Sequence, residues 1–386
     1  MKTKSKIPAL RFKGFTDAWE QRKLGEVSKY SNGGSYENDV VENGTYELIT
    51  LKSVNMSGKL VSSGKFINRE TKTLEKDTLV MILSEQAPGL LGMTAKIPEN
   101  NRYVLNQRVA EIKPNTNIDS YFLSMSINRS QAYFSKRGAG TKVQNISKPN
   151  VENFEFYCPS EREQQKIGSF FKQLDETIAL HQRKCEQTKE LKKTMLQKMF
   201  SKKGERIPEI RFPEFTDEWE EKKLGEVVER EIKGKAKANM QGTKSIYLET
   251  EYLNGGETTF VDSDADIEED DILILWDGSQ AGTVYHGFFG ALGSTLKAYR
   301  PKESGKFVYY QLVAHQEMIF QRYRTPNIPH VIKTFTDEFS VFTTSLSEQE
   351  RIGNFFKHLD TLIALHQSKC DSLKELKKTL LRQLFV

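Results

Sequence analysis

The chain has 386 residues, of which 28% are charged and 37% are apolar, and its formal net charge is +5. These values are typical of a soluble globular protein of two or three domains, and no apolar run approaches the roughly 20 residues that a membrane helix needs. Only three cysteines occur, and no apolar stretch follows the basic N-terminus. We therefore expect a cytoplasmic protein with no disulfide framework, secretory signal or membrane segment.

A short phrase near the N-terminus recurs two hundred residues later. RFKGFTDAWEQRKLGEV begins at Arg11, and RFPEFTDEWEEKKLGEV begins at Arg211. Extended backwards, residues 7–27 match residues 207–227 at 14 of 21 positions. The period is too long for a solenoid, whose repeats are about 20–50 residues, so the repeat predicts a duplicated pair of domains. We expect the phrase to begin each domain and to anchor it to the rest of the molecule.

The segments after the two phrases, about residues 28–159 and 228–346, differ in sequence but show the same order of secondary-structure signals. DTLVMILSEQAPG from Asp77 and DILILWDGSQAG from Asp271 each give an acidic turn, a β-rich run and a polar loop with glycine. A helical stretch and a short strand follow later in each segment. We therefore predict two homologous α+β domains whose surfaces have diverged.

Two further segments, residues 167–200 and 352–385, match at 22 of 34 positions. Neither contains proline, each has one glycine near its start, and apolar or tolerated residues recur at alternating spacings of four and three. This pattern predicts two coiled-coil helices, each about 50 Å long. The predicted seam residues of the helix pair include Leu174, Ile178, His181, Cys185, Leu359, Ile363, His366 and Cys370. The simplest arrangement is an antiparallel pair about a pseudo-twofold axis; two surface helices packed on their own domains are the alternative.

The predicted fold class is thus α+β: two homologous domains separated by two long antiparallel helices that form a coiled coil, with a pseudo-twofold internal repeat. The predicted boundaries are residues 1–159 for the first domain, 160–203 for the first helix, 204–346 for the second domain and 347–386 for the second helix.

Known catalytic motifs are missing from the sequence. It has no G-x-x-x-x-G-K-[ST] loop, no G-x-G-x-x-G after a strand, and neither Asn-Pro-Pro-Tyr nor Asp-Pro-Pro-Tyr. We expect the acidic run at residues 262–271 to be a solvated turn. His181, Cys185, His366 and Cys370 would meet if the helices crossed at their midpoints, and two His with two Cys can bind zinc. Half-polar seam packing explains them as well, so we predict no catalytic residue, cofactor or metal site.

Two similar domains with different surfaces on a rigid helical pair suit the reading of two unlike features a fixed distance apart. DNA is the natural target, because its helical repeat of about 34 Å brings equivalent groove surfaces to the same side of the duplex at a fixed spacing. The mild positive charge permits this interpretation without demanding it. A coiled-coil adaptor that binds other proteins, and a self-contained nuclease or methyltransferase, are the alternatives.

The repeated motifs carry a family resemblance. The phrase RFxxFTDxWExxKLGEV, the passage NISKPNVENFEFYCPSEREQQKIG at residues 145–168, and its partner LSEQERIG at residues 346–353 resemble the DNA-specificity subunit of type I restriction–modification systems. The resemblance covers essentially the whole chain. The Glu-Gln-x-x-Ile-Gly start of each long helix is fairly specific because it occurs twice.

The resemblance implies that each variable segment is a target-recognition domain that reads one half of a bipartite, asymmetric site in double-stranded DNA. The helix pair would set the spacer length and dock two methyltransferase (modification) subunits, which bind S-adenosylmethionine and methylate adenine at N6. Restriction/translocase subunits, with ATP and Mg, would cleave unmodified DNA. The chain itself would be a non-catalytic subunit.

Side chains for DNA contact are expected in the polar loops, because Arg and Lys read guanine, Asn and Gln read adenine, and cationic and hydroxyl groups hold phosphates. In the first domain the candidates are Ser84, Glu85, Gln86, Asn106, Gln107, Arg108, Lys136, Arg137, Lys142, Gln144 and Asn145. In the second domain they are Lys233, Lys235, Lys237, Lys244, Asp277, Gln280, Arg322, Arg324 and Asn327. An ordinary solvated loop residue is the alternative for any one of them. Trp276 is expected in the core, and Trp19 and Trp219 are expected to be packing residues.

Overall fold

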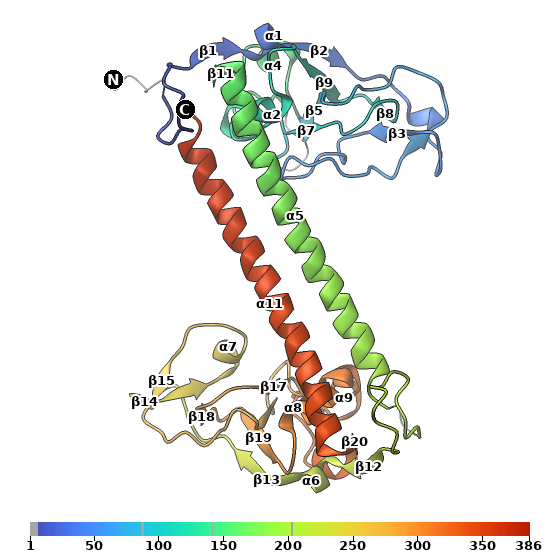
Figure 1. The fold of residues 1–386 in the computed structure, drawn as a ribbon, viewed down its shortest axis with the longest axis vertical. Helices are drawn as coiled ribbons and strands as arrows, with labels where there is room; N and C mark the ends of the chain where they lie inside the picture. Colours follow the sequence, from blue (N-terminus) through green and yellow to red (C-terminus); the bar gives the residue numbers. More distant parts are fainter. Residues whose placement is uncertain (1–6, 86–88, 141, 202–203) are drawn as a thin grey trace. The chain divides into compact units, whose positions relative to one another are not determined.

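The computed structural model describes residues 7–85, 89–140, 142–201 and 204–386 (Figure 1). Contacts divide the chain into two compact units, one formed by Met1–Leu180 with Cys370–Val386 and the other by His181–Lys369. Each unit therefore holds one copy of the repeated phrase, one variable segment and part of each long helix. None of the described helices combines the length and apolarity that crossing a bilayer requires.

The first unit contains two small sheets and two antiparallel strand pairs. The four-stranded antiparallel sheet has the order β2–β9–β5–β7, with strands β2 (Ser28–Asn32), β9 (Val109–Pro114), β5 (Leu79–Ile82) and β7 (Thr94–Lys96). The second sheet has the order β4–β3–β8, from β4 (Phe66–Ile67), β3 (Tyr46–Ile49) and β8 (Tyr103–Leu105). The antiparallel pairs are β1 (Glu20–Lys23) with β11 (Glu155–Cys158), and β6 (Ser84–Glu85) with β10 (Gln144–Asn145). The short helices are α1 (Leu24–Val27), η1 (Glu37–Asp39), α2 (Ser120–Asn128), α3 (Gln131–Ser135) and α4 (Lys148–Glu152).

The second unit repeats this topology. Its four-stranded sheet has the order β13–β19–β16–β17, from β13 (Val228–Lys233), β19 (Leu296–Pro301), β16 (Ile272–Leu275) and β17 (Val284–His286). Its second sheet has the order β15–β14–β18, from β15 (Phe260–Val261), β14 (Gln241–Leu248) and β18 (Ala291–Leu292). The strand β12 (Glu220–Lys223) pairs with β20 (Ser340–Thr343). The helices are α6 (Leu224–Val227), α7 (Thr250–Leu253), α8 (Gly305–Ala314), α9 (Gln316–Arg322) and α10 (Phe335–Glu338). The prediction of two homologous α+β domains is confirmed.

The central strand of each domain is buried on both faces, which explains its uninterrupted apolar sequence. In β5, Leu79 and Met81 belong to one core cluster, whereas Val80 and Ile82 belong to another. The four residues of β16 divide in the same way between two clusters. Alternate side chains of a strand point to opposite faces, so each domain has a core on either side of its sheet.

The long helices are α5 (Glu161–Lys198) and α11 (Leu346–Gln383). In the first unit, Asp175 on α5 binds Lys377 on α11 at 2.7 Å. In the second unit, Lys192 on α5 binds Asp360 on α11 at 2.6 Å. These two ion pairs are equivalent in the repeat. Within each unit the helices run antiparallel, as predicted, and the lysines that interrupt the seam select the register by pairing across it.

The repeated phrase packs at the place where one long helix begins and the other ends. In the first unit, Arg11 donates twice to the carboxylate of Glu163 at 2.7 Å, in the first turn of α5. The N–H of Leu10 donates to the carbonyl of Gln383, at the end of α11, at 2.9 Å. Trp19, which is 1% exposed, lies edge-on to the Phe385 ring near the C-terminus.

The second copy makes the same contacts with the helices exchanged. Arg211 donates to Glu348, near the start of α11, at 2.6 and 2.7 Å, and the N–H of Ile210 donates to the carbonyl of Lys198 at 2.9 Å. Trp219 is fully buried and packs on Phe200, just after the end of α5. The prediction that Trp19 and Trp219 are packing residues is confirmed, and the phrase recurs because each domain needs the same joint to the helices.

Candidate nucleic-acid interface

In the first domain three segments meet where β5 ends. Leu83, directly after β5, donates its N–H to the carbonyl of Arg108 at 3.0 Å and accepts the N–H of Ile146 at 3.0 Å. These bonds hold together the loop after β5, the turn between β8 and β9, and the hairpin formed by residues 136–140 and 142–146. Ser84 then pairs with Asn145 in the β6–β10 ladder.

The second domain uses the same bonds at equivalent positions. Trp276, directly after β16, donates its N–H to the carbonyl of Thr295 at 2.8 Å and accepts the N–H of Val331 at 3.0 Å. An isolated bridge joins Asp277 to His330. By this pattern Arg108 corresponds to Thr295, Ser84 to Asp277, and Asn145 to His330. One backbone framework therefore presents different side chains in the two domains.

Glycine fixes part of this framework at the end of the first strand of each sheet. A Cβ on Gly33 would lie 2.0 Å from the carbonyl oxygen of Asn106, and a Cβ on Gly234 would lie 1.9 Å from that of Gly293. No other residue permits so close an approach of two backbones. The strand end and the turn that carries Arg108 or Thr295 are thus held at one distance in both domains.

Two predicted contact residues are used inside the first domain. Ser84 and Glu85 are 3% and 7% exposed, and Ser84 Oγ is hydrogen-bonded to the side-chain oxygen of Asn145. Glu85 accepts the N–H groups of three successive loop residues, 89–91, at 2.7–3.0 Å. Both side chains are buried and bonded within the domain, which argues against the predicted contact of Ser84 and Glu85 with DNA. Gln86 lies outside the described residues.

In the turn of residues 106–108, hydrogen bonds to Glu37 hold the first two residues in place, and the third residue, Arg108, is an exposed cation. Asn106 is 8% exposed, and its amide donates to Glu37 at 3.4 Å; the amide of Gln107 also donates to Glu37. Hydrogen bonds, first from Ser35 and then from the backbone and these amides, lower the pKa of Glu37 to about 2, so it stays ionised. Arg108 is exposed and has φ +64°. This left-handed conformation is strained for arginine, and such strain concentrates at functional sites.

Two lysines that sequence reasoning missed line the same turn. Lys52 and Lys65 join Arg108 and Glu37 around a hollow of roughly 450 Å³. They come from the loop after β3 and from the residue before β4, so the sequence places them far apart. The sequence gives little indication that they belong to a DNA-binding site, because each is a single lysine in a polar loop. Three cations outnumber the one ionised carboxylate of Glu37 around this hollow, and the excess of positive charge favours an anionic ligand.

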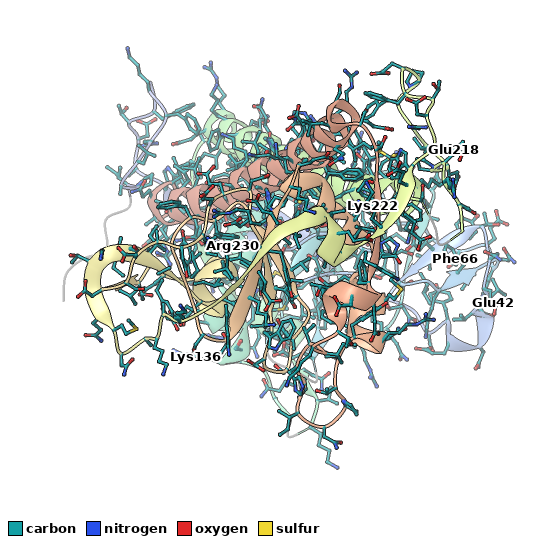
Figure 2. All side chains as sticks on the ribbon, turned by 90° about the horizontal axis from the view of Figure 1, so that it is seen from below. Glu42, Phe66, Lys136, Glu218, Lys222 and Arg230 are labelled. Carbon is teal, nitrogen blue, oxygen red and sulfur yellow. The ribbon has the colours of Figure 1, made fainter. Side chains whose placement is uncertain are left out.

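The hairpin formed by residues 136–140 and 142–146 is the second exposed part of the first domain. Lys136, Arg137, Lys142 and Gln144 are exposed; Figure 2 labels Lys136. The Arg137 guanidinium lies 3.7 Å from the ring centroid of Tyr133, which holds its charge in place. The backbones of Ala139 and Asn145 pair and close the hairpin.

Lysines dominate the first part of the second domain. Lys233, Lys235 and Lys237 are exposed, and within the described parts of the chain none of them forms an ion pair. Lys244 is bound to the exposed Asp264 at 2.7 Å, which offsets its charge. Phosphate contact therefore fits the first three better.

The loop after β16 and the hairpin at residues 322–332 form one surface. Asp277, Gln280, Arg322 and Asn327 are exposed. Arg324 donates to the carbonyl of Ser279 at 3.1 Å, and the N–H of Gly278 donates to the carbonyl of Pro329 at 3.0 Å. Trp276 is half-buried and packs against the hydrophobic core on one side of the second domain's four-stranded sheet. The Lys297 ammonium lies 3.5 Å from the Trp276 ring centroid.

The predicted seam residues lie along α5 and α11. Buried members are Leu174, Ile178, Cys185, Leu359 and Cys370, and half-buried members are His181, Ile363 and His366. In the second unit, His181 Nδ1 lies 3.1 Å from His366 Nδ1, whereas Cys185 Sγ faces the Ile363 carbonyl at 3.8 Å. In the first unit, Cys370 packs in the same cluster as Ile178. Within the described residues, no three His, Cys, Asp or Glu side chains are grouped to hold a metal.

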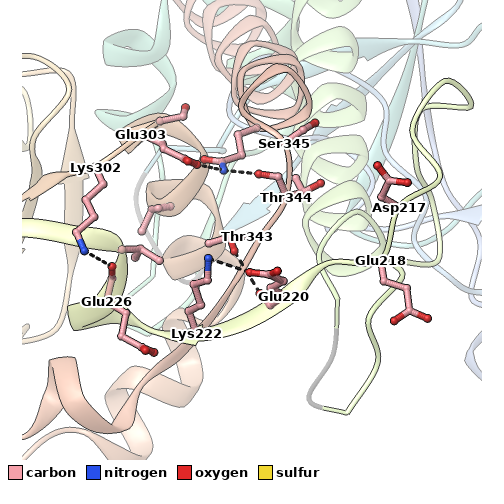
Figure 3. A pocket seen from close by; sticks show the side chains of 14 residues that line it. Asp217, Glu218, Glu220, Lys222, Glu226, Lys302, Glu303, Thr343, Thr344 and Ser345 are labelled. Atoms are coloured by element: carbon pink, nitrogen blue, oxygen red, sulfur yellow. Dashed lines mark hydrogen bonds and ion pairs between the residues drawn. The ribbon is translucent and has the colours of Figure 1, made fainter.

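A polar hollow of roughly 300 Å³ lies beside the second copy of the phrase (Figure 3). Lys222 pairs with Glu220 at 2.9 Å, Lys302 donates to the carbonyl of Glu226 at 2.7 Å, and Gln349 donates to Glu303. These groups satisfy one another, so we assign no ligand to this hollow.

The chain matches the family of the type I restriction modification DNA specificity domain over residues 16–190 and 216–375. The specificity subunit of the type I restriction enzyme MjaVIII from Methanocaldococcus jannaschii is 29% identical over 194 residues, which are 47% of this chain and 45% of that protein. The chain thus aligns with just under half of that relative. The S subunit of the type I restriction-modification system from M. genitalium shares the fold, with a TM-score of 0.72, 19% identity, and coverage of 98% of this chain and 99% of that one. Together with the duplicated domains and helices, these matches establish that the chain belongs to the type I restriction–modification DNA specificity family.

Proposed function

We propose that this chain binds a bipartite, asymmetric site in double-stranded DNA, with each domain reading one half. The observation that carries the proposal is the shared framework with unlike side chains. Arg108 stands where the second domain has Thr295, and Asn145 stands where it has His330. Equal backbones position the two domains' side chains alike, and unlike side chains select different bases.

Within each half-site, we assign base reading and phosphate binding to different residues. Arg108 and Gln107 in the first domain, and Asp277 and Gln280 in the second, are exposed around the framework bonds and have the hydrogen-bonding groups that base edges require. The exposed lysines, including Lys52 and Lys65 beside Arg108, suit phosphates. This division predicts that lysine variants weaken binding to all sequences, whereas variants around the framework change sequence choice.

We further propose that the chain is non-catalytic and cytoplasmic and that two methyltransferase subunits dock on its helices. The support is a duplicated set of exposed leucines. Leu180 and Leu191 on α5 are 45% and 43% exposed, and their repeat equivalents on α11, Leu365 and Leu376, are 59% and 47% exposed. A surface present twice binds the same partner twice. S-adenosylmethionine, ATP and Mg would belong to these and to the restriction/translocase subunits. The cysteines are all free, as in a reducing compartment.

The test is to map N6-methylated adenines in a genome that carries this chain with its partner subunits. One motif with two defined halves and a fixed spacer is expected. A single continuous motif, or methylation unrelated to sequence, contradicts the proposal. Incubation of the purified chain with labelled S-adenosylmethionine and DNA should give no transfer; transfer without a partner would make the chain an enzyme.

Salt dependence separates DNA recognition from a protein adaptor. Six to ten phosphate contacts lose about 10³- to 10⁵-fold in affinity between 50 and 200 mM salt. A mobility-shift titration of the complex should show such a fall. Absent or salt-insensitive binding, with the partners present, would instead support the adaptor.

A further inference from the structure

The hairpin at residues 322–332 ends in a rigid, exposed tip of four residues, Pro326 to Pro329. Ile328 is 79% exposed, and Asn327 beside it is also exposed. Below the tip the N–H of Thr325 donates to the carbonyl of His330 at 3.0 Å. The tip is thus a short closed loop with an amide and an isoleucine at its end.

Hydrogen bonds and prolines fix this loop before any ligand binds. The N–H of His330 donates to the Thr325 hydroxyl oxygen at 3.2 Å, and that hydroxyl donates to the Ile328 carbonyl at 2.5 Å. Pro326 and Pro329 each restrict φ to about −65°. A loop held in this way loses little conformational entropy on binding, so its contacts contribute more fully to affinity.

A single exposed isoleucine is common on protein surfaces and decides nothing by itself. Here it is adjacent to an asparagine whose side chain makes no hydrogen bond to any described residue. Two arginines precede the tip on one arm, Arg322 at the end of α9 and Arg324 in the hairpin, and Arg324 ties the hairpin to the polar loop after β16. With the exposed Asp277 bridged to His330, the surroundings of the tip are polar with an excess of positive charge, which suits DNA better than an apolar protein surface.

An A·T pair offers matching chemistry in the major groove. Asparagine bonds adenine N6 and N7 together, and an apolar side chain contacts the thymine 5-methyl group. Asn327 and Ile328 supply these two groups side by side. The equivalent hairpin of the first domain, closed by Ala139 and Asn145, carries Lys142 and Val143 instead, so the two tips differ in chemistry.

We propose that the Asn327–Ile328 tip reads one A·T base pair in the half-site of the second domain, with Asn327 on adenine and Ile328 against the thymine methyl group. This inference rests on the proposed function. An apolar wedge between two base steps is the competing arrangement, and the tests below distinguish it.

The first test is to map the methylated motif with the full chain and its partner subunits. Asn327→Ala should reduce the preference for A·T at one position by about 5- to 150-fold. Ile328→Ala should reduce it at the same position by about fourfold, the contribution of one buried methyl group, whereas Ile328→Val should retain it. The control Phe289→Ala removes another exposed apolar side chain of this domain, 56% exposed, and should leave that position unchanged.

The second test replaces thymine by uracil, one position at a time, in a duplex that carries the mapped site. The unmodified protein should lose about fourfold in affinity at one thymine, and the Ile328→Ala variant should lose nothing further there. Unchanged affinity at every thymine, or an equal loss at all positions with increased 2-aminopurine fluorescence beside the tip, would overturn the assignment, the latter in favour of a wedge. If the unmodified protein directs no motif at all, the proposed function fails first, and this inference fails with it.

Discussion

The joint between the second domain and the helices should depend on one buried ion pair. Glu348 is fully buried, and its carboxylate accepts two bonds from Arg211 at 2.6 and 2.7 Å, one from Trp219 at 3.2 Å and one from Thr344. Hydrogen bonding to Glu348 is the main cause that raises the pKa of Arg211. Arg211→Met would leave an uncompensated carboxylate in the core, which costs about 3–5 kcal/mol.

Calorimetry of the full chain measures this cost. In a unit of 150–250 residues each kcal/mol corresponds to about 2–4 °C, so the transition of the second unit should fall by roughly 6–20 °C. The control Lys222→Met breaks an ion pair within the same phrase, but Lys222 and Glu220 are 42% and 71% exposed, so its effect should stay below about 1 kcal/mol.

A double variant separates the buried charge from the loss of packing. Arg211→Met with Glu348→Leu removes both charges and should recover most of the lost stability, because the penalty arises from leaving one charge alone. Arg11→Met should destabilise the first unit in the same way, since Glu163 is 1% exposed. If Arg211→Met costs no more than Lys222→Met, or if the double variant is worse than the single one, the reasoning about the joint is wrong.

Three further predictions follow from the helices and the framework. Burial, and then the charge of His366, lower the pKa of His181. The folded state therefore binds this proton less readily than the unfolded state, so the contribution of His181 to the free energy of unfolding is fully present above about pH 6.5 and is lost as the pH falls below it. His181→Gln should flatten this fall in a series of denaturant titrations at different pH values. Gly234→Ala should cost roughly 1–3 kcal/mol because its Cβ would overlap a carbonyl, whereas Gly225→Ala, with 3.4 Å to its nearest neighbour, should cost far less in the same urea titration. A fragment of residues 1–203 should dimerise through its one long helix and direct modification of a palindrome; sedimentation as a monomer at micromolar concentration would contradict this.

The helices and the duplication could be predicted because their signals are local. A seam with alternating spacings of four and three identifies a coiled coil without knowledge of the rest of the chain. The same holds for the tryptophans of the repeated phrase, since an identical aromatic residue in both copies indicates shared packing. Even the lysines that interrupt the seam, Lys192 and Lys377, are intelligible once each is seen to bind an aspartate of the other helix.

The candidate site was harder to predict because distant segments build it. Ser84 and Glu85 follow a strand and look like exposed loop residues in sequence. Yet Asn145, about sixty positions later, pairs with Ser84 and covers it. Likewise β3 and β8 are parallel neighbours, which brings Lys52 toward Arg108. No local periodicity encodes such pairings, so a sequence pattern identifies the loops and not which of their side chains are exposed.

The arrangement separates the residues that hold each domain together from those that choose its target. Buried groups such as Glu348 and Trp219 secure the joint, and backbone bonds secure the framework, so neither depends on the side chains at the exposed positions. Arg108 and Thr295 occupy equivalent positions and are both exposed, and exposed substitutions usually change stability by less than about 0.5 kcal/mol. Such positions can therefore diverge between two copies of one domain while the fold stays the same. Arg108→Ala should accordingly alter one position of the first half-site and leave unfolding unchanged, whereas Arg211→Met should do the reverse.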